Sequence, residues 1–481
     1  MTATRKSDLR VRNGILVTPE GETQGGVAIQ GGKIVAIGRD DTLPDAEEDI
    51  DAKGNYILPG LIDPHLHFQD AYYKYEQLIE SETRAAAAGG ITTVIPMVFS
   101  RTNVEESFHN YLPSYIETGK KRSSVDFAFS TILFNSEQIE ELPSYATEYG
   151  VTSHKVMMAY RGPEAEVFGV RAVDDAQILR TLEQVAEIGP PAVTMIHTEN
   201  MDIVYAHKAK LMATGRNDLA AYAEARPAFA EEENLRRALY YAELTKAPLY
   251  VVHMSIGNGV ELIRQAKARG IKVTAETCPH FLIFTGEDAP HEWMGKVNPP
   301  IRSKWHQDML WEGIASGVIS TIGSDHSTLM PYENKMKDGL WSAVPGFPGT
   351  GEILGVMLTA GVAAGRISMS KLVEVCSTNV AKAFGLYPRK GCLWPGSDGD
   401  VVIVDPHKKH KVSVENHHSA ATYNLYAGVE FTGWPVMTIV RGRVVMKDNE
   451  IVAPVGHSEY LPRTVGTGVP GKSARVPVSV R

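Results

Sequence analysis

Short alternating runs of apolar and polar residues mark both ends of the chain. Within residues 1–60, this alternation occurs in GILVTP, GGVAIQGGKIVAIG and NYILPG, with glycine at the turns. From residue 386 onward the same pattern returns in GDVVIVDP and VMTIVRGRVVMKDNEIV. Neither end carries a long helical periodicity, so the two ends are predicted to form one antiparallel β unit together.

The middle of the chain has a different pattern, in which apolar strand candidates alternate with longer helical segments. Helical spacing followed by glycine occurs in YEQLIESETRAAAAGG, SEQIEELPSYATEYG, DDAQILRTLEQVAEIG and GNGVELIRQAKARG. The eight strand candidates are LPGLIDPHLH, ITTVIPMV, VDFAFSTIL, VTSHKVMMA, AVTMIHTEN, APLYVVHMS, IKVTAETCPHFL and VISTIGSDH. Near-continuous apolar strands that alternate with helices indicate a parallel sheet, and eight such units predict an α/β fold of the (β/α)8 TIM-like barrel type.

These patterns divide the chain into two domains and a tail. Residues 58–385 are predicted to form the barrel domain. Residues 1–57 plus 386–465 are predicted to form a smaller β-sandwich domain built from both termini. Residues 466–481, GTGVPGKSARVPVSVR, are rich in Gly, Pro and Arg and are predicted to be an extended C-terminal tail.

Composition narrows the class of protein. Hydrophobic residues make up 43% of the chain and charged residues 22%, as in an ordinary globular protein. The chain has a net charge of -9 and no block of like charges, which argues against nucleic acid or a membrane surface as a binding partner. Three distant cysteines, Cys278, Cys376 and Cys392, predict no disulfide framework and favour a reducing compartment. Because no signal peptide or membrane span is recognisable, a cytoplasmic protein is expected.

Polar residues stand at the carboxyl ends of the strand candidates. His65 and His67 end the first one and share a face, because residues two apart in a strand point to the same side. A single strand histidine is more often a hydrogen-bonded core residue than a ligand, and a strand-end aspartate is often a helix N-cap. In a barrel, however, these ends meet at the active-site mouth. The other polar residues at strand ends are Lys155, His197, His253 and Asp325.

This set of six side chains predicts a metal centre. Imidazole and carboxylate ligands suit divalent first-row metals, with zinc expected. The four histidines and the aspartate are more ligands than one catalytic zinc requires, so two divalent ions are predicted, with an anion between them. The fourth strand offers only Lys155, whose ammonium group would oppose metal binding. We therefore interpret Lys155 as an amine, neutralised by burial and nearby metals, that CO2 converts to a carbamate, N6-carboxylysine.

Five motifs, GLIDPHLHF, SHKVMMAY, IHTEN, VVHMS and GSDH, together resemble the amidohydrolase superfamily. The most similar branch is the cyclic amidohydrolases: dihydropyrimidinase (hydantoinase), dihydroorotase and allantoinase. The resemblance extends over nearly the whole chain. It implies one buried metal, one more exposed metal and a bridging carboxylated lysine. The implied ligands are His65, His67 and Asp325 for the first metal, His197 and His253 for the second, and Lys155 for the bridge.

The resemblance also implies a mechanism. A hydroxide held by the metals adds to the carbonyl carbon of a cyclic amide, and the Tyr160 hydroxyl helps stabilise the developing oxyanion. Asp325 takes the hydroxide proton and delivers it to the leaving nitrogen. The product is one linear molecule. Relatives of this kind are commonly dimers or tetramers, so a homo-oligomer is expected.

The substrate-binding motifs combine features of several branches. Gln69 stands where dihydroorotases and allantoinases carry an arginine that pairs with a carboxylate or ureide, which counts against an anionic substrate. VNPPIR, with Asn298, resembles dihydroorotases, whereas HKVMMAY and IHTEN resemble hydantoinases. Tyr160, Asn298, His280 and Gln69 are the candidate substrate contacts, although loop packing is an equal alternative for His280.

Three functional hypotheses follow. The leading one is a binuclear metal-dependent hydrolase that opens a cyclic amide, imide or ureide of the hydantoin or dihydropyrimidine type. The second keeps the metal centre but acts as an allantoinase-like ureide hydrolase or cleaves an acyclic amide or carbamate. The third is a non-catalytic scaffold; such relatives of dihydropyrimidinases usually lack metal ligands, whereas this sequence retains all six.

Overall fold

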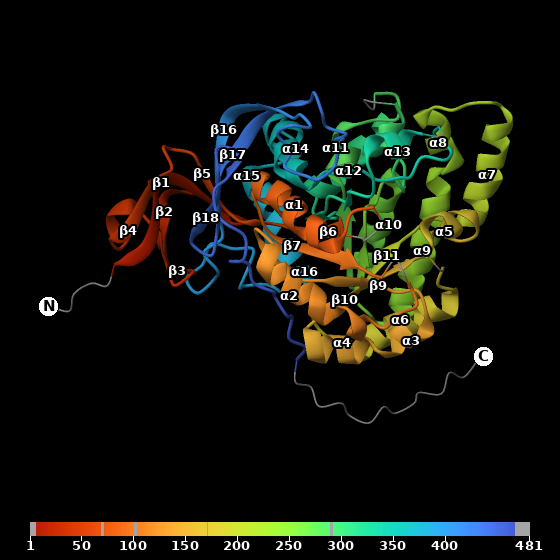
Figure 1. The fold of residues 1–481 in the computed structure, drawn as a ribbon, viewed down its shortest axis with the longest axis horizontal. Helices are drawn as coiled ribbons and strands as arrows, with labels where there is room; N and C mark the ends of the chain where they lie inside the picture. The colour runs from red at the N-terminus through yellow and green to blue at the C-terminus, as the bar shows by residue number, and fades with distance from the viewer. Residues whose placement is uncertain are drawn as a thin grey trace.

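A computed structural model describes residues 6–68, 72–100, 103–170, 172–288, 292–337 and 339–466. Figure 1 shows a barrel beside a smaller β unit, in which red N-terminal strands and blue C-terminal strands lie together. The predicted fold class, a barrel with a smaller β domain built from both termini, is confirmed. The domain boundaries stay predictions.

The smaller unit is a nine-stranded sheet, ordered β19-β18-β17-β16-β5-β1-β2-β3, with β4 paired to β1. It is not antiparallel throughout, as the alternation suggested, because the chain crosses over after β3 and brings β4 and β5 parallel to β1. The two chain ends join where β5 pairs with β16. The strands are β1 (Ser7–Thr18), β2 (Gly21–Gln30), β3 (Lys33–Gly38), β4 (Ala46–Asp51), β5 (Tyr56–Pro59), β16 (Val401–Lys411), β17 (Glu430–Val440), β18 (Arg443–Lys447) and β19 (Glu450–Ile451).

The barrel sheet is parallel in every pairing and closes where β15 pairs with β6. Its third and eighth strands are each formed by two short segments, β8 with β9 and β14 with β15. Each of the eight predicted strands therefore has a counterpart. The segments are β6 (Leu61–His67), β7 (Ile91–Val98), β8 (Asp126–Phe127), β9 (Ser130–Ile132), β10 (Ser153–Met157), β11 (Val193–His197), β12 (Leu249–Val251), β13 (Val273–Thr277), β14 (Thr321–Ile322) and β15 (His326–Ser327).

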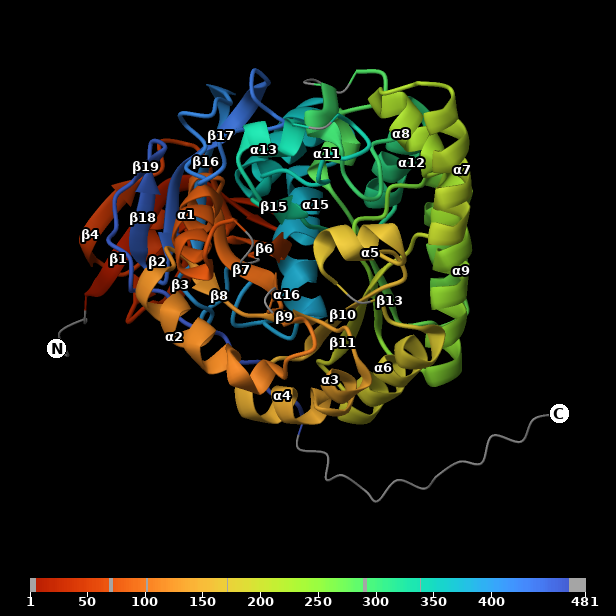
Figure 2. The same cartoon turned by 45° about the vertical axis from the view of Figure 1, so that its right-hand side comes forward.

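Helices surround the barrel, and α7 and α9 run along one outer edge (Figure 2). The four predicted helical segments correspond to α1, α3 with α4, α6 and α10. Pro143 separates α3 from α4, because proline lacks the N–H that would continue the first helix. The helices are α1 (Tyr75–Ala88), α2 (Leu112–Arg122), α3 (Ser136–Glu140), α4 (Leu142–Tyr149), α5 (Pro163–Phe168), α6 (Asp175–Ile188), α7 (Met201–Ala213), α8 (Leu219–Ala225), α9 (Ala228–Thr245), α10 (Gly257–Ala268), α11 (Pro279–Ile283), α12 (Lys304–Ala315), α13 (Tyr332–Met336), α14 (Ile353–Val356), α15 (Met369–Val373) and α16 (Asn379–Ala383). In the described part of the chain, none of the helices combines the length and hydropathy that crossing a membrane requires.

A buried ion cluster connects the barrel to the smaller unit. Nζ of Lys390 lies 2.6 Å from the carboxylate of Asp126, on β8, and 2.7 Å from that of Asp400, just before β16. The side chain of Lys390 is 1% exposed, so both ion pairs are shielded from water. Nearby carboxylates hold the pKa of Lys390 above its ordinary value, although burial opposes them. The lysine is therefore charged and bridges the two units.

Replacing Lys390 by alanine is expected to lower the free energy of unfolding by about 3–5 kcal/mol, because carboxylates stay buried without their cation. The measurement is the shift of the thermal and urea midpoints. Lys304→Ala is the matched control, since it removes an exposed pair with Asp308 within one helix and should change stability by less than about 1 kcal/mol. Equal midpoints for the two variants would contradict the stabilising role of Lys390.

Candidate active site and metal centre

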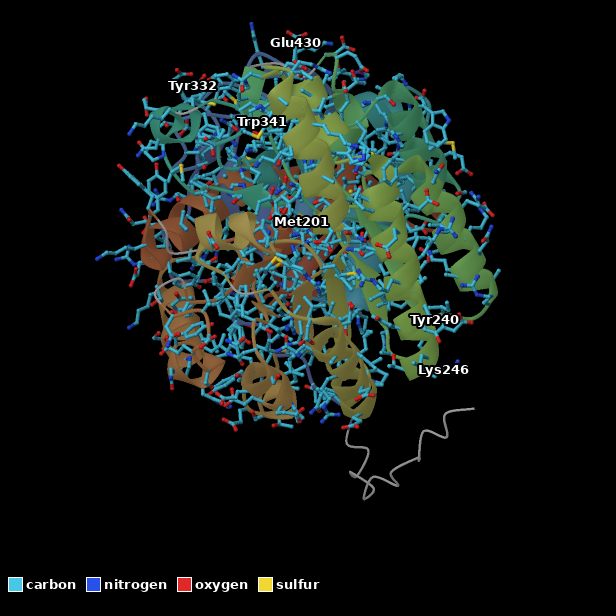
Figure 3. All side chains as sticks on the ribbon, turned by 90° about the vertical axis from the view of Figure 1, so that its right-hand side faces the viewer. Met201, Tyr240, Lys246, Tyr332, Trp341 and Glu430 are labelled. Atoms are coloured by element: carbon cyan, nitrogen blue, oxygen red, sulfur yellow. The ribbon has the colours of Figure 1, made fainter. Side chains whose placement is uncertain are left out.

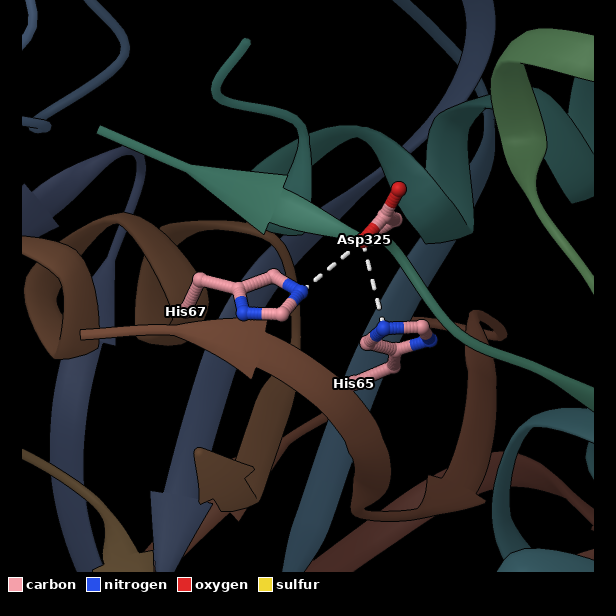
Figure 4. Close-up of side chains that lie close together, drawn as sticks. All are labelled: His65, His67 and Asp325. Carbon is pink, nitrogen blue, oxygen red and sulfur yellow. Dashed lines mark hydrogen bonds and ion pairs between the residues drawn. The ribbon is translucent and has the colours of Figure 1, made fainter. Parts of the chain in front are cut away.

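Strand β6 and the turn after β14 bring three metal-type donors together (Figure 4). Nε2 of His65 and Nε2 of His67 lie 3.2 and 3.1 Å from Oδ1 of Asp325. One ligand atom from each residue lies within 4.8 Å of the other two. His65 is fully buried, whereas the side chains of His67 and Asp325 are 14% and 11% exposed. These are the three residues that the family resemblance implies for the more buried metal.

Lys155, on β10, lies against this group. Its Nζ is 2.9 Å from Nε2 of His65, and the residue is only 2% exposed. Burial lowers the pKa of Lys155 below its ordinary value, although nearby carboxylates oppose that change. Burial therefore shifts Lys155 toward the neutral amine relative to a lysine exposed to water.

The two remaining histidines complete the cluster from neighbouring strands. The rings of His197, at the end of β11, and His253, just after β12, have centroids 4.4 Å apart. His253 also lies 5.2 Å from the ring of His65, and Tyr160 lies 5.6 Å from the ring of His197. The structure thus brings all six sequence-predicted side chains to one end of the barrel.

A buried glutamate that the sequence motifs did not identify contacts two of these residues, His65 and His253. Oε1 of Glu276, on β13, lies 2.7 Å from Nδ1 of His65 and accepts the backbone N–H of His253 at 2.9 Å. Its Oε2 accepts the hydroxyl of Tyr250 at 2.8 Å. Burial raises the pKa of Glu276 to about 8, while these donors favour the carboxylate. A Cβ at Gly323 would lie 2.5 Å from Oε2, so glycine leaves room for this carboxylate.

This contact bears on which ring nitrogen of His65 carries the hydrogen. When Nδ1–H points at Glu276, Nε2 carries a lone pair and faces the acceptor Oδ1 of Asp325 at 3.2 Å. Nε2 of His65 and Oδ1 of Asp325 are then two acceptors in close contact, and a cation that binds both atoms would stabilise this arrangement. The donor set therefore fits a metal ion.

A second missed carboxylate orients His197. Oε2 of Glu199 lies 2.7 Å from Nε2 of His197, and Arg226 donates to both oxygens of Glu199 at 2.8 and 2.9 Å. Burial alone would raise the pKa of Glu199. The charge of Arg226 and the contact with His197 outweigh burial and hold this pKa below its ordinary value, so the group stays ionised. Arg226 also pairs with Glu164 at 2.7 Å. This network leaves Nδ1 of His197 as the acceptor.

Three site residues adopt left-handed backbone conformations. The φ angles are 36° at His253, 53° at Asp325 and 58° at Tyr160. Non-glycine residues rarely adopt positive φ, and such strain gathers where the surrounding structure holds functional groups in place. The backbone of His253 is held by the bond from its N–H to Glu276.

The cluster opens into a pocket of about 630 Å³, including space open to solvent. The mixed polar and apolar lining suits a small-molecule site. Its polar wall includes five of the predicted ligands together with Tyr160 and Asn298. Its apolar wall includes Phe99, Ile132, Met157, Val170, Leu329 and Pro345.

The other predicted substrate contacts have different positions. Asn298 lines the pocket, and its Oδ1 accepts a hydrogen bond from the hydroxyl of Tyr222. His280 is buried in α11, outside the described pocket lining, and its ring packs against Phe281 and Phe347 with centroids 4.1 and 5.0 Å away. Gln69 lies outside the described residues. Its role and that of His280 stay predictions.

Comparisons with known sequences agree with this site. Residues 56–445 match the model of the amidohydrolase family. The chain is 35% identical to the D-hydantoinase of Geobacillus stearothermophilus over 467 residues, covering 94% of this chain and 96% of that protein. It is 36% identical to the L-hydantoinase of Paenarthrobacter aurescens over 468 residues, covering 95% and 98%.

Solved structures extend the similarity to the fold. The L-hydantoinase (dihydropyrimidinase) of Arthrobacter aurescens has a TM-score of 0.87 and 34% identity, covering 95% of this chain and all 100% of that one. The dihydropyrimidinase of Brevibacillus agri has a TM-score of 0.86 and 33% identity, covering 95% and 98%. The chain belongs to the amidohydrolase family and is similar to its cyclic amidohydrolase branch, as the motifs predicted. It is thus a hydrolase of amide-type carbon–nitrogen bonds, and the family implies a centre of divalent metal ions.

Proposed function

We propose that this protein is a binuclear metal-dependent hydrolase that opens neutral cyclic amides of the hydantoin or dihydropyrimidine type. The observation that carries the proposal is the gathering of the six polar side chains at one end of the barrel, where five of them line the pocket. The similarity to hydantoinases and dihydropyrimidinases over most of the chain supports the same substrate class.

Zinc is the proposed metal, because imidazole and carboxylate donors suit it. His65, His67 and Asp325 would hold one ion, and His197 and His253 the other. Lys155 would bridge them as N6-carboxylysine; its burial favours the neutral amine, which attacks the carbon of CO2 and loses a proton to form the carbamate. Two bound dications would lower the pKa of water and polarise the substrate carbonyl.

The remaining steps belong to side chains of this chain. Asp325, at the pocket wall, takes the proton of the attacking water and delivers it to the leaving nitrogen. That transfer matters because an amide nitrogen leaves poorly without a proton. The hydroxyl of Tyr160 donates to the carbonyl oxygen as it becomes negative.

Asn298 orients the substrate. Because Tyr222 engages its oxygen, the amide nitrogen is the atom that donates to a ligand. The side chain of Asn298 is buried at the pocket wall and also hydrogen-bonds with that of Tyr160. A carbonyl of the substrate ring would accept hydrogen bonds from this pair of side chains.

The pocket lining favours a neutral substrate with an apolar substituent. Lys155 is the only lysine or arginine among the described lining residues, and its proposed carbamate is an anion. A substrate carboxylate would therefore lack a cation to pair with. The wall formed by Phe99, Ile132 and Leu329 instead offers apolar contact.

The test is hydrolysis by the full chain after loading with zinc. The panel contains hydantoin, a hydantoin with an apolar 5-substituent, dihydrouracil, allantoin, dihydroorotate and a linear N-carbamoyl amino acid. We expect the substituted hydantoin to have a kcat/KM at least about 10-fold above that of dihydroorotate, since each buried CH2 contributes about 0.8 kcal/mol and the carboxylate lacks a partner. Cleavage of the linear compound without opening of any ring would overturn the proposal in favour of an acyclic amidohydrolase.

A further inference from the structure

An irregular segment, residues 339–347, forms part of the pocket wall. It contains neither helix nor strand, so contacts from outside the segment help to hold it in place. Two of its residues, Pro345 and Gly346, line the pocket. Figure 3 labels Trp341, within the segment, and Tyr332, at the start of helix α13, in the upper part of the view. We call residues 339–347 the rim segment.

Lys296 holds the rim segment at two points. Its Nζ donates to the carbonyl of Leu340 at 2.8 Å, and its backbone carbonyl accepts the N–H of Gly346 at 2.9 Å. The residue is 5% exposed and lies two positions before Asn298, which lines the same pocket. Its Nζ also lies 4.9 Å from the ring centre of Tyr222, whose hydroxyl donates to Asn298. Lys296 therefore joins the rim segment to the part of the wall that carries Asn298.

A second buried lysine, Lys335 on α13, holds the same glycine. Its Nζ donates to the carbonyl of Gly346, and the residue is 1% exposed. The ring centres of Tyr423 and Phe347 lie 5.4 and 6.0 Å from this Nζ. Gly346 has a φ of 108°, and a Cβ there would lie 3.1 Å from that of Ser327, so glycine is favoured at this position. The two lysines thus contact both polar backbone groups of one pocket-lining residue.

Stability of the fold does not account for these two lysines. Burial lowers the pKa of each to about 7, because the interior disfavours their charge. Within the described part of the chain, carbonyl oxygens and aromatic rings contact the two amines, and neither amine forms an ion pair with a carboxylate. An apolar side chain of similar length would fill the same space without the desolvation penalty. Two buried amines at one segment therefore indicate that its position matters for function.

We propose that Lys296 and Lys335 are positioning residues that hold the rim segment and thereby set how the ring substituent of the substrate fits the pocket. The inference rests on the proposed function for the class of substrate and adds the residues that select within that class. Neither lysine is among the described residues of the pocket lining, so both act through Gly346 and its neighbour Pro345. A wall that is held in place before binding loses less conformational freedom when the substrate arrives.

Lys296→Met keeps the length of the side chain and removes its N–H donors. It should raise KM for a hydantoin with an apolar 5-substituent at least about 10-fold, and KM for unsubstituted hydantoin less than about 3-fold. The reason is that the substituent loses the wall at Pro345, whereas the ring itself is held by the metal ions and Asn298 under the proposed function. The values of kcat and metal content should stay within about 2-fold, because the change removes binding rather than chemistry. Lys335→Met should show the same split between KM and kcat.

Hydrogen exchange gives a second readout that needs no substrate. In Lys296→Met, amides of the rim segment should exchange at least about 10-fold faster than in the unchanged chain, because the contact with Leu340 is lost. Lys267→Met is the matched control, since Nζ of Lys267 donates to the carbonyl of Val318 at 2.8 Å and neither residue is among the described pocket lining. It should leave KM, kcat and exchange of the rim segment unchanged.

The outcomes separate this inference from the proposed function. Unchanged exchange of the rim segment in Lys296→Met and Lys335→Met overturns the positioning role, and an unchanged ratio of the two KM values overturns the selection of substituents. Failure of both variants to fold also overturns the proposal, because the lysines would then serve stability. A wild-type chain that opens no ring contradicts the proposed function instead, and exchange of the rim segment still decides whether the lysines hold it.

Discussion

The Lys155→Ala variant is expected to lose at least about 10²–10³-fold in kcat/KM and to retain fewer than the two metal ions proposed for the unchanged protein. The physical reason is that two adjacent dications repel, and the proposed carbamate is the anion between them. Without it, His65 and His67 can still bind an ion with Asp325, so partial occupancy is expected rather than none. Metal analysis and ring-opening assays measure both effects.

A labelling experiment separates the carbamate from a merely structural lysine. Protein loaded with metal in ¹³C-bicarbonate should show one carbamate carbon by NMR, and Lys155→Ala should lack it. Lys335→Ala is the matched control, because Lys335 is also buried and burial lowers its pKa to about 7. Its Nζ donates to the carbonyl of Gly346 instead of facing the histidine cluster. An unlabelled wild-type protein with full metal content would refute the bridging role.

The Glu276→Gln variant is expected to weaken binding of both metal ions by about 10–100-fold with little change in shape. The amide can donate to Nδ1 of His65, which moves the ring hydrogen to Nε2 and blocks the nitrogen that faces Asp325. It also weakens the bond that holds the backbone of His253. Competition with a chelator, monitored by metal release, measures the two affinities.

Glu199→Gln provides the comparison, because Glu199 contacts only His197 among the six cluster residues in the described contacts. Glu199→Gln should weaken binding of the ion that His197 holds and leave binding of the other ion unchanged. If Glu276→Gln binds both ions as tightly as the unchanged protein, Glu276 has no positioning role.

The sequence is informative where chemistry and periodicity coincide. The eight strands were predictable because each is an apolar run followed by a turn or helix, as in Ile91–Val98. The cluster residues were predictable because His65, His67 and Lys155 are unusual at the ends of such runs. Their convergence follows from the barrel itself, in which parallel strands end at one rim.

Other parts of the site depend on contacts that no short pattern encodes. Glu276 is the one charged residue in VTAETC, and only the closed barrel shows that it meets residues of two other strands. Arg226 reaches Glu199 from a loop 27 positions later in the chain. The left-handed backbone at Tyr160 and Asp325 is likewise set by tertiary contacts rather than by local preference.

The pairing of β5 with β16 has a consequence for synthesis on the ribosome. The first five strands emerge early, yet the edge of β5 that faces β16 is completed only when Val401–Lys411 has been made. At about 5–20 residues per second, this edge waits roughly twenty seconds to a minute while the whole barrel is translated. A nascent chain that stops before Val401 therefore keeps an open β edge, which makes truncated products prone to aggregate.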